Sequence, residues 1–232
     1  MDLVFATGNA GKLREAAEIL GPGFRVLSPA DVGLAGFDVE ETGTTFRENS
    51  LLKARALWQA CGLPCFADDS GLEVDALGGA PGIYSARYAS DHNFASNIDR
   101  LLAELGAICS HPQKRPKTSV TPVSEGGSPT KMAENVGESI LSSAPLTFPG
   151  AARFRCVVTL ILEDGKPNFF DGACEGRIAR ERHGSGGFGY DPVFVPDLYP
   201  NLTMAELSED AKNAISHRGV ALRLMSSWLA TR

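Results

Sequence analysis

Two adjacent acidic residues, Asp68 and Asp69, follow the short apolar run 64–67. Neighbouring carboxylates repel each other when both are ionised, and a bound cation relieves that repulsion. Mg²⁺ prefers a few carboxylates together with water and phosphate oxygens, so the pair is a candidate magnesium site. Together with the glycine-containing segments 7–12 and 186–191, the pair indicates a metal-dependent enzyme that acts on a nucleotide.

The segment 7–12 is a candidate anion site. Residues 2–6 have the apolar pattern of a buried strand, and a helix is expected over 12–20 after the Gly-Asn-Ala-Gly turn. Free backbone N–H groups and the dipole at a helix start favour a phosphate, and the lysine of the segment adds positive charge. The segment is not a P-loop, because only two residues separate its glycines and a leucine follows its lysine. The alternative is a plain turn before a helix.

Further carboxylates stand at Glu40 and Glu41, just before a second predicted helix. With the pair at 68–69 they complete the set that a magnesium site needs. Taken alone, this segment is a solvated acidic loop, and Lys53 on the helix is a surface lysine.

Residues 184–189 match the letters G-x-G-x-x-G. A Rossmann fingerprint opens a helix, whereas 190–194 is expected to continue as extended chain, so that assignment fails. Glycines around aromatic residues favour close approach of the backbone to a flat ligand that stacks on a ring. A purely structural glycine loop is the alternative.

Ser216, His217, Arg218 and Gly219 lie at a predicted break between helices. Histidine beside arginine offers hydrogen-bond donors that suit a keto oxygen and not an amino group. An ordinary helix cap explains the same four residues without any ligand.

These motifs need elements to position them. The mixture of strands and helices does not alternate strictly, which is typical of an α/β protein with a mixed sheet and flanking helices. A capping box at 45–48 and an Asp-Gly turn at 164–165 are its sharpest local signals. The expected elements are strands at 2–6, 64–67, 154–162 and 168–172, helices at 12–20, 45–62, 93–105 and 211–230, a loop at 78–82 and a capping box at 203–206.

Residues 107–149 interrupt this pattern, within what is expected to be one domain over 1–232. Six prolines lie there among serine, threonine and glycine, with a basic run at 114–117. Such a composition buries too little apolar surface to offset the entropy of ordering it. We expect a disordered or loosely packed insertion, with one short helix over 132–141.

The overall composition is that of a soluble globular protein. The 232 residues are 43% hydrophobic and 22% charged, and the net charge of −6 argues against a broad nucleic-acid-binding face. The five cysteines have no CxxC spacing, which disfavours zinc and a disulfide framework. With no signal peptide or membrane span expected, the predicted location is the cytoplasm.

These blocks, in this order, resemble the Ham1/RdgB family of noncanonical purine nucleoside triphosphate pyrophosphatases (inosine triphosphate pyrophosphatases). The resemblance covers everything outside the insertion, where relatives have a short connection. It rests on the segments 7–12, 41–46, 48–49, 53–54, 67–72, 78–82, 85–87, 187–192 and 216–218.

The resemblance implies a role for each matching residue. Asp69 is expected as the general base and a Mg²⁺ ligand, with Glu41 and Asp68 completing the metal site. Segment 7–12, Lys53 and Ser70 would hold the triphosphate, residues 188–191 would pack on the base, and Lys212, His217 and Arg218 would read its 6-keto edge. The expected substrate-binding residues are Thr7, Gly8, Asn9, Ala10, Gly11, Lys12, Lys53, Ser70, Phe188, Gly189, Tyr190, Asp191, Lys212, His217 and Arg218.

By the same resemblance, the fold has two lobes around a central cleft, and the protein is a homodimer with no nucleic-acid polymer or membrane as partner. It would hydrolyse ITP, dITP or XTP to the monophosphate and pyrophosphate. Three alternatives stay open: a Maf-like pyrophosphatase with another base preference, a nucleotide sensor without catalysis, and an enzyme that removes the terminal phosphate.

Overall fold

The protein is built on one six-stranded sheet in the order β2-β1-β3-β4-β5-β6. The computed structural model describes residues 1–110 and 146–232. Strand β1 is parallel to β2 and β3, and every later pairing is antiparallel, which confirms the predicted mixed sheet. The strands are β1 (Asp2–Phe5), β2 (Arg25–Leu27), β3 (Cys65–Val74), β4 (Ala152–Ile161), β5 (Pro167–Ile178) and β6 (Phe194–Pro196).

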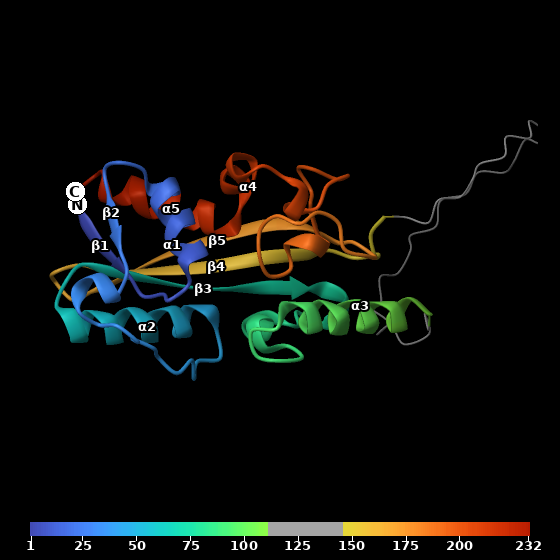
Figure 1. The fold of residues 1–232 in the computed structure, drawn as a ribbon, viewed down its shortest axis with the longest axis horizontal. Helices are drawn as coiled ribbons and strands as arrows, with labels where there is room; N and C mark the ends of the chain where they lie inside the picture. Colours follow the sequence, from blue (N-terminus) through green and yellow to red (C-terminus); the bar gives the residue numbers. More distant parts are fainter. Residues whose placement is uncertain (111–145) are drawn as a thin grey trace, which may run out of the picture.

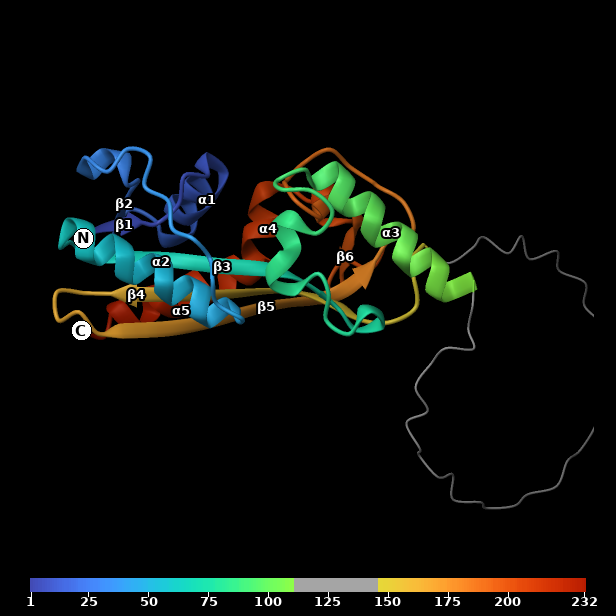
Figure 2. The ribbon, with the colours of Figure 1, turned by 90° about the horizontal axis from the view of Figure 1, so that it is seen from below.

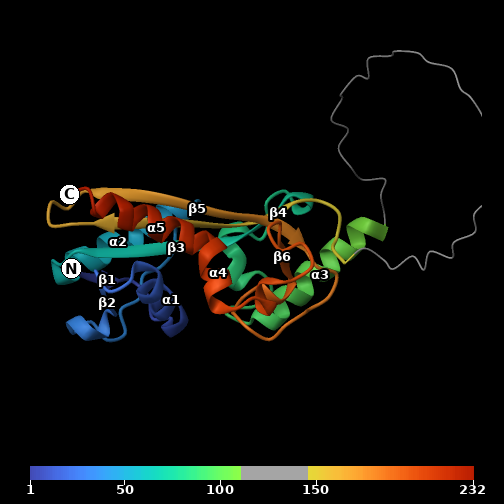
Figure 3. The ribbon, with the colours of Figure 1, turned by 90° about the horizontal axis from the view of Figure 1, so that it is seen from above.

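Helices cover both faces of this sheet. Figure 1 shows α1 and α5 on one face and α2 and α3 on the other. Helix α5 lies along β5 (Figure 3), and α3 and β6 lie at the end away from both termini (Figure 2). The helices are α1 (Ala10–Leu20), α2 (Phe46–Cys61), α3 (Phe94–Ser110), α4 (Glu209–Ile215) and α5 (His217–Leu229).

Strand β3 is longer than expected. It runs through Cys65–Val74, not 64–67, so the acid pair lies in its middle and not at its end. The reason is β4, which pairs with all ten residues of β3 and supplies a backbone ladder past the acids. On its other edge, β3 loses its parallel neighbour after Phe66, because β1 ends at Phe5.

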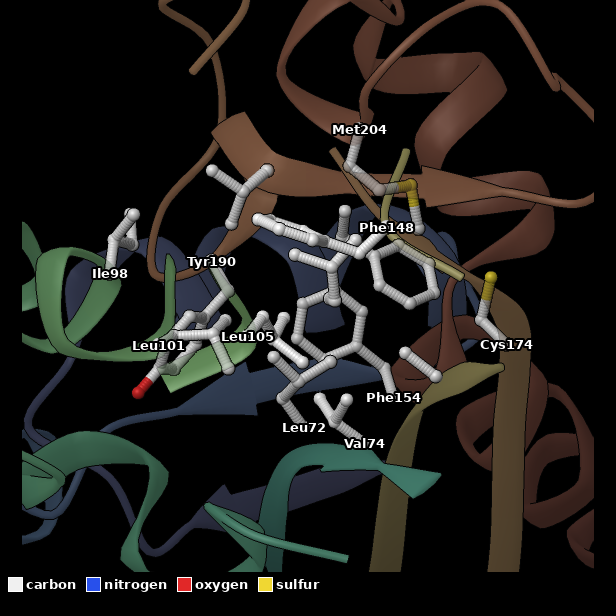
Figure 4. Close-up of a cluster of buried hydrophobic side chains, with 14 residues drawn as sticks. Leu72, Val74, Ile98, Leu101, Leu105, Phe148, Phe154, Cys174, Tyr190 and Met204 are labelled. Atoms are coloured by element: carbon white, nitrogen blue, oxygen red, sulfur yellow. The ribbon is translucent and has the colours of Figure 1, made fainter. Parts of the chain in front are cut away.

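Three buried apolar clusters hold the layers together. One lies between the sheet and α1 and α5, a second lies under α2, and the third joins α3 to the far ends of β4 and β5. Figure 4 shows the third, with Phe154 and Tyr190 among Leu72, Leu101 and Leu105. Strands β4 and β5 contribute to the cluster at the α1 and α5 end and to the cluster at the α3 end. The two expected lobes therefore share one sheet.

Capping and glycine signals in the sequence predicted several element boundaries to within a few residues. The capping box at 45–48 is present, and α2 ends at Gly62 with φ +68°. Helix α1 begins two residues before the expected start, because Asn9 caps it. The box at 203–206 is also formed but opens only one 3₁₀ turn. Residues 191–193 likewise form a 3₁₀ turn before β6, where extended chain was expected.

The boundaries of the predicted insertion at 107–149 change. Helix α3 continues through Ser110, and Phe148 is buried with its N–H bonded to the Ile178 carbonyl. The remainder, 111–145, lies outside the described residues, as does the predicted helix at 132–141.

Helix α5 sits directly against β5 at Gly172. A Cβ added there would be 2.0 Å from the carbonyl oxygen of His217 and 2.8 Å from the Ala221 nitrogen. A glycine is therefore required for this approach. The contact fixes the first turn of α5, which carries two predicted site residues.

Candidate active site

The strand β3 sends its two acidic side chains to opposite faces of the sheet. Side chains alternate along a strand, and Phe66 belongs to the cluster under α1 and α5 whereas Ala67 belongs to the one under α2. Asp68 therefore faces α1 and α5, and Asp69 faces α2. The expectation that both carboxylates gather one cation needs correction, because the strand separates them.

Both carboxylate oxygens of Asp68 are already paired. Lys12 Nζ lies 2.9 Å from Oδ1, and Arg218 Nε lies 2.9 Å from Oδ2. Burial alone would raise the pKa of Asp68, but the charges of Lys12 and Arg218 outweigh it and hold this pKa far below its usual range. We therefore do not assign Asp68 to a metal.

Glu15 completes this buried network. Arg218 is 1% exposed, and its Nη1 donates to Glu15 while its Nη2 lies 3.4 Å from the Ser70 hydroxyl. Sequence reasoning missed Glu15, although its position three residues after Lys12 places the two on one helix face. The network joins α1, β3 and α5 at one wall of the site.

The second acid, Asp69, lies in a different group. Lys53 Nζ is 2.6 Å from Glu41 Oε1 and 3.5 Å from Asp69 Oδ1, so one cation bridges two carboxylates. Arg87 Nη1 is 3.5 Å from the other oxygen of Glu41. Lys53 is consequently a half-buried ion-pair partner and not the surface lysine that its spacing suggested.

The Asp69 carboxylate is poised to accept a proton. Burial raises the pKa of Asp69 to about 6, Lys53 lowers it and Glu41 raises it. Among the described residues, its Oδ2 atom has no hydrogen-bond partner although it is buried. A carboxylate with a free oxygen and a pKa near neutrality is a suitable general base.

The turn at 7–12 is partly closed by its own side chains. Asn9 Oδ1 accepts the N–H groups of Gly11 at 2.8 Å and Lys12 at 3.1 Å. These two N–H groups are therefore already bonded, whereas the sequence had suggested that they are free. Thr7, Gly8, Asn9 and Lys12 line the cavity described below, whereas Ala10 and Gly11 are outside its lining.

An aromatic wall stands across the cavity. The Asp191 carboxylate accepts from Lys212 Nζ at 2.6 Å and from the Phe188 N–H at 2.8 Å. Lys212 Nζ lies 4.5 Å from the centroid of the Phe188 ring, which is 38% exposed. Tyr190, in contrast, turns its ring into the core (Figure 4). Its hydroxyl donates to the Ser85 carbonyl. Phe188 is thus the ring that is open to a ligand.

His217 stands at the same end of the cavity. Its ring stacks on Phe154 with centroids 4.8 Å apart, and its Nδ1 has no partner among the described residues. Burial and the Arg218 charge hold the pKa of His217 well below its ordinary value. A neutral imidazole offers one donor and one acceptor to a ligand.

One cavity of about 800 Å³ brings these groups together. This is within the range of small-molecule sites. Arg87 and Glu15 also line it, beyond what the sequence predicted. The predicted residues in its lining are Thr7, Gly8, Asn9, Lys12, Glu41, Lys53, Asp68, Asp69, Ser70, Phe188, Gly189, Tyr190, Asp191, Lys212, His217 and Arg218.

The carboxylates of Glu41 and Asp69 fit a Mg²⁺ ion. They converge on one ammonium group, and Asp69 Oδ2 is a buried oxygen without a partner. Within 1–110 and 146–232, no set of three acidic, histidine or cysteine side chains has a metal-binding arrangement. Two carboxylates with water and phosphate oxygens are the environment that Mg²⁺ prefers.

The whole chain is similar to proteins of known type. A model of the Ham1 family matches residues 3–145 and 143–228. A dITP/XTP pyrophosphatase of Thioalkalivibrio sulfidiphilus is 42% identical, with 100% of both chains covered. One from Porphyromonas gingivalis is 40% identical, covering 98% of this chain and 96% of the relative.

Solved structures agree with the sequence comparison. The Staphylococcus aureus Ham1 protein has a TM-score of 0.73 and 36% identity, covering 100% of this chain and 99% of its own. A HAM1 protein from Coxiella burnetii has a TM-score of 0.75 and 34% identity, with both chains fully covered.

The buried pairing of Asp68 predicts a large stability effect. We expect Asp68→Asn to lower the free energy of unfolding by about 3–5 kcal/mol, because Arg218 then keeps a buried charge with one partner fewer. The pKa of Asp68 is lowered in the fold, so this contribution is present above the unfolded pKa of about 3.9 and is lost as the pH falls. Urea unfolding measures the change.

The matched control is Asp171→Asn. That exposed carboxylate lies 3.9 Å from Arg155 on the same sheet, and its loss is expected to cost less than about 1 kcal/mol. Equal, small losses in the two variants would contradict the structural role given to Asp68.

Proposed function

The chain belongs to the Ham1 family, and from that premise we propose that it hydrolyses noncanonical purine nucleoside triphosphates (ITP, dITP or XTP) to the monophosphate and pyrophosphate. One observation carries the proposal. One cavity is lined both by Asp69 and Lys53 and by the exposed Phe188 ring with polar donors around it. A nucleotide needs both groups of residues, one for its phosphates and one for its base.

The base end favours a 6-keto purine. Phe188 offers a stacking surface, and His217 and Lys212 offer N–H groups to a keto oxygen. Arg218 binds carboxylates through Nε and Nη1, and its Nη2, which lies 3.4 Å from the Ser70 hydroxyl, has a second N–H to offer a ligand. Adenine would turn an amino group toward these donors, at a cost of about 1–3 kcal/mol for each unpaired group.

The phosphate end supplies charge and a base. We propose that Asp69 accepts a proton from the water that attacks the α-phosphorus, and that Glu41 and Asp69 hold Mg²⁺. When bound, the ion supplies neutralisation of the phosphate charge. Lys53 and Lys12 provide positive charge for the triphosphate, and the turn at 7–12 lines the same cavity. Ser70 lines the same end.

Three finer points belong to the proposal: one domain over 1–232 and a homodimer, which rest on the family resemblance, and a cytoplasmic location, which rests on the sequence. All five cysteines are free thiols, which supports a reducing compartment. In the part of the chain that the structure describes, no helix is both long and apolar enough to cross a membrane.

A nucleotide panel tests the activity directly. Purified protein with Mg²⁺ receives dITP, ITP, XTP, dATP, dGTP, dTTP and UTP, and pyrophosphate and orthophosphate are measured separately. We expect pyrophosphate as the first product and kcat/KM for dITP roughly 5- to 150-fold above that for dATP, from one or more unpaired donors. Faster cleavage of dTTP or UTP would favour a Maf-like enzyme, and orthophosphate as first product would favour terminal phosphate removal.

Substitution of the base gives a second test. Asp69→Asn is expected to lower kcat by about 10²- to 10⁴-fold, because an amide accepts no proton from water. The fold should persist, since burial already disfavours the charge of Asp69. Asp75→Asn is the control, because Asp75 lies at the end of β3 and pairs with Arg153 outside the cavity. Unchanged pyrophosphate release in Asp69→Asn would refute the assignment.

A further inference from the structure

Helix α2 buries an asparagine one turn after its cap. Asn49 is fully buried, four residues after the N-cap Thr45. Asparagine is a poor helix former, and a buried amide without partners costs about 1–3 kcal/mol. An asparagine at this position therefore destabilises the fold unless both the oxygen and the nitrogen of its side chain have hydrogen-bond partners.

One end holds the loop that carries Glu41. Asn49 Oδ1 accepts the N–H of Gly43 at 2.8 Å. A Cβ on Gly43 would lie 2.6 Å from that same oxygen and 2.7 Å from Glu48 Cβ, so the loop lies directly on the helix. Because Glu41 is two residues before Gly43, this bond limits where its carboxylate lies.

The other end faces Asp69. Among the described residues, Asn49 Nδ2 and Asp69 Oδ2 are both buried and both lack a hydrogen-bond partner. Asn49 lies four residues before Lys53 on the same face of α2, and Lys53 Nζ is 3.5 Å from Asp69 Oδ1. The unpaired donor and the unpaired acceptor therefore lie on the facing sides of a helix and a strand that pack together.

We propose that Asn49 is a positioning residue that sets Glu41 and Asp69 relative to each other. Its Oδ1 fixes the Glu41 loop, and its Nδ2 is the donor that orients the Asp69 carboxylate. Partners of this kind behind reactive or metal-binding carboxylates typically change affinity or activity 10- to 100-fold when they are removed. The inference rests on the proposed function for its catalytic consequence. Its geometric basis is the observed bond to the Gly43 N–H and the two buried, unpaired atoms of Asn49 and Asp69.

Glu48 provides a matched control. It attaches the same loop, since its carboxylate accepts from the N–H groups of Thr44 and Thr45, but it is exposed and outside the cavity lining. A variant at Glu48 therefore loosens the loop without touching Asp69. A general loss of loop attachment would affect both positions alike.

Two substitutions separate the two ends of Asn49. Asn49→Leu removes both hydrogen-bonding groups at similar volume. Asn49→Asp keeps an oxygen for the Gly43 N–H and suits a helix N-terminus, but it replaces the donor with a second carboxylate oxygen that repels Asp69.

Hydrogen exchange and NMR read the two bonds without any turnover. We expect the Gly43 amide to be protected in wild type and in Asn49→Asp, and unprotected in Asn49→Leu. The side-chain NH₂ signals of Asn49 should move in Asp69→Asn and stay in place in Asp75→Asn. Equal protection of the Gly43 amide in all these proteins would overturn the proposed attachment of the Glu41 loop. Asn49 NH₂ signals that do not move in Asp69→Asn would overturn the proposed orientation of Asp69.

Kinetics with dITP and Mg²⁺ test the consequence. We expect kcat to fall about 10- to 100-fold in both Asn49 variants, with a smaller change in KM, and to stay close to wild type in Glu48→Ala. If Asn49→Leu does not fold, Asn49→Asp alone decides. Wild-type kcat in Asn49→Asp, or an equal loss in Glu48→Ala, would overturn the proposal. A wild-type protein inactive on every nucleotide would refute the proposed function instead, and the NMR results would still decide on Asn49.

Discussion

The alternation of side chains along β3 is the constraint on which the site depends. Asp68 and Asp69 are neighbours in sequence, but the strand places one on the α1 and α5 face and the other on the α2 face. The first meets two cations that occupy both of its oxygens. The second meets one shared lysine and keeps an oxygen free. Two identical residues therefore acquire a structural role and a reactive role from environment alone.

The buried charge network on the Asp68 face explains much of the surrounding architecture. Buried charges are tolerated only when they are paired, and Arg218 meets this requirement through Asp68 and Glu15. The break between α4 and α5 at Ser216 starts α5 where Arg218 reaches β3, and Gly172 lets that turn approach the sheet. The same turn presents His217 to the cavity.

Much of this arrangement was predictable from local signals, and what was missed has physical causes. The capping box at 45–48 indicated the start of α2 and Gly62 its end, because those signals act within a few residues. The length of β3 was missed because its ladder comes from β4, whose paired residues lie 78 to 96 positions later in the chain. Because the predicted strand ended before Asp68, the placement of Asp68 and Asp69 on opposite faces was not predicted. Glu15 and Asn49 were missed because each is one buried polar residue on a helix, meaningful only through its partner in space.

The most direct test of the two unlike aspartates is a carboxyl-carbon NMR titration of the metal-free protein. The account predicts that Asp69 titrates with a pKa of about 6, whereas Asp68 stays ionised at every pH at which the protein remains folded. If both carboxylates titrated together near the ordinary aspartate value of about 3.9, the separation of their roles by β3 would be contradicted.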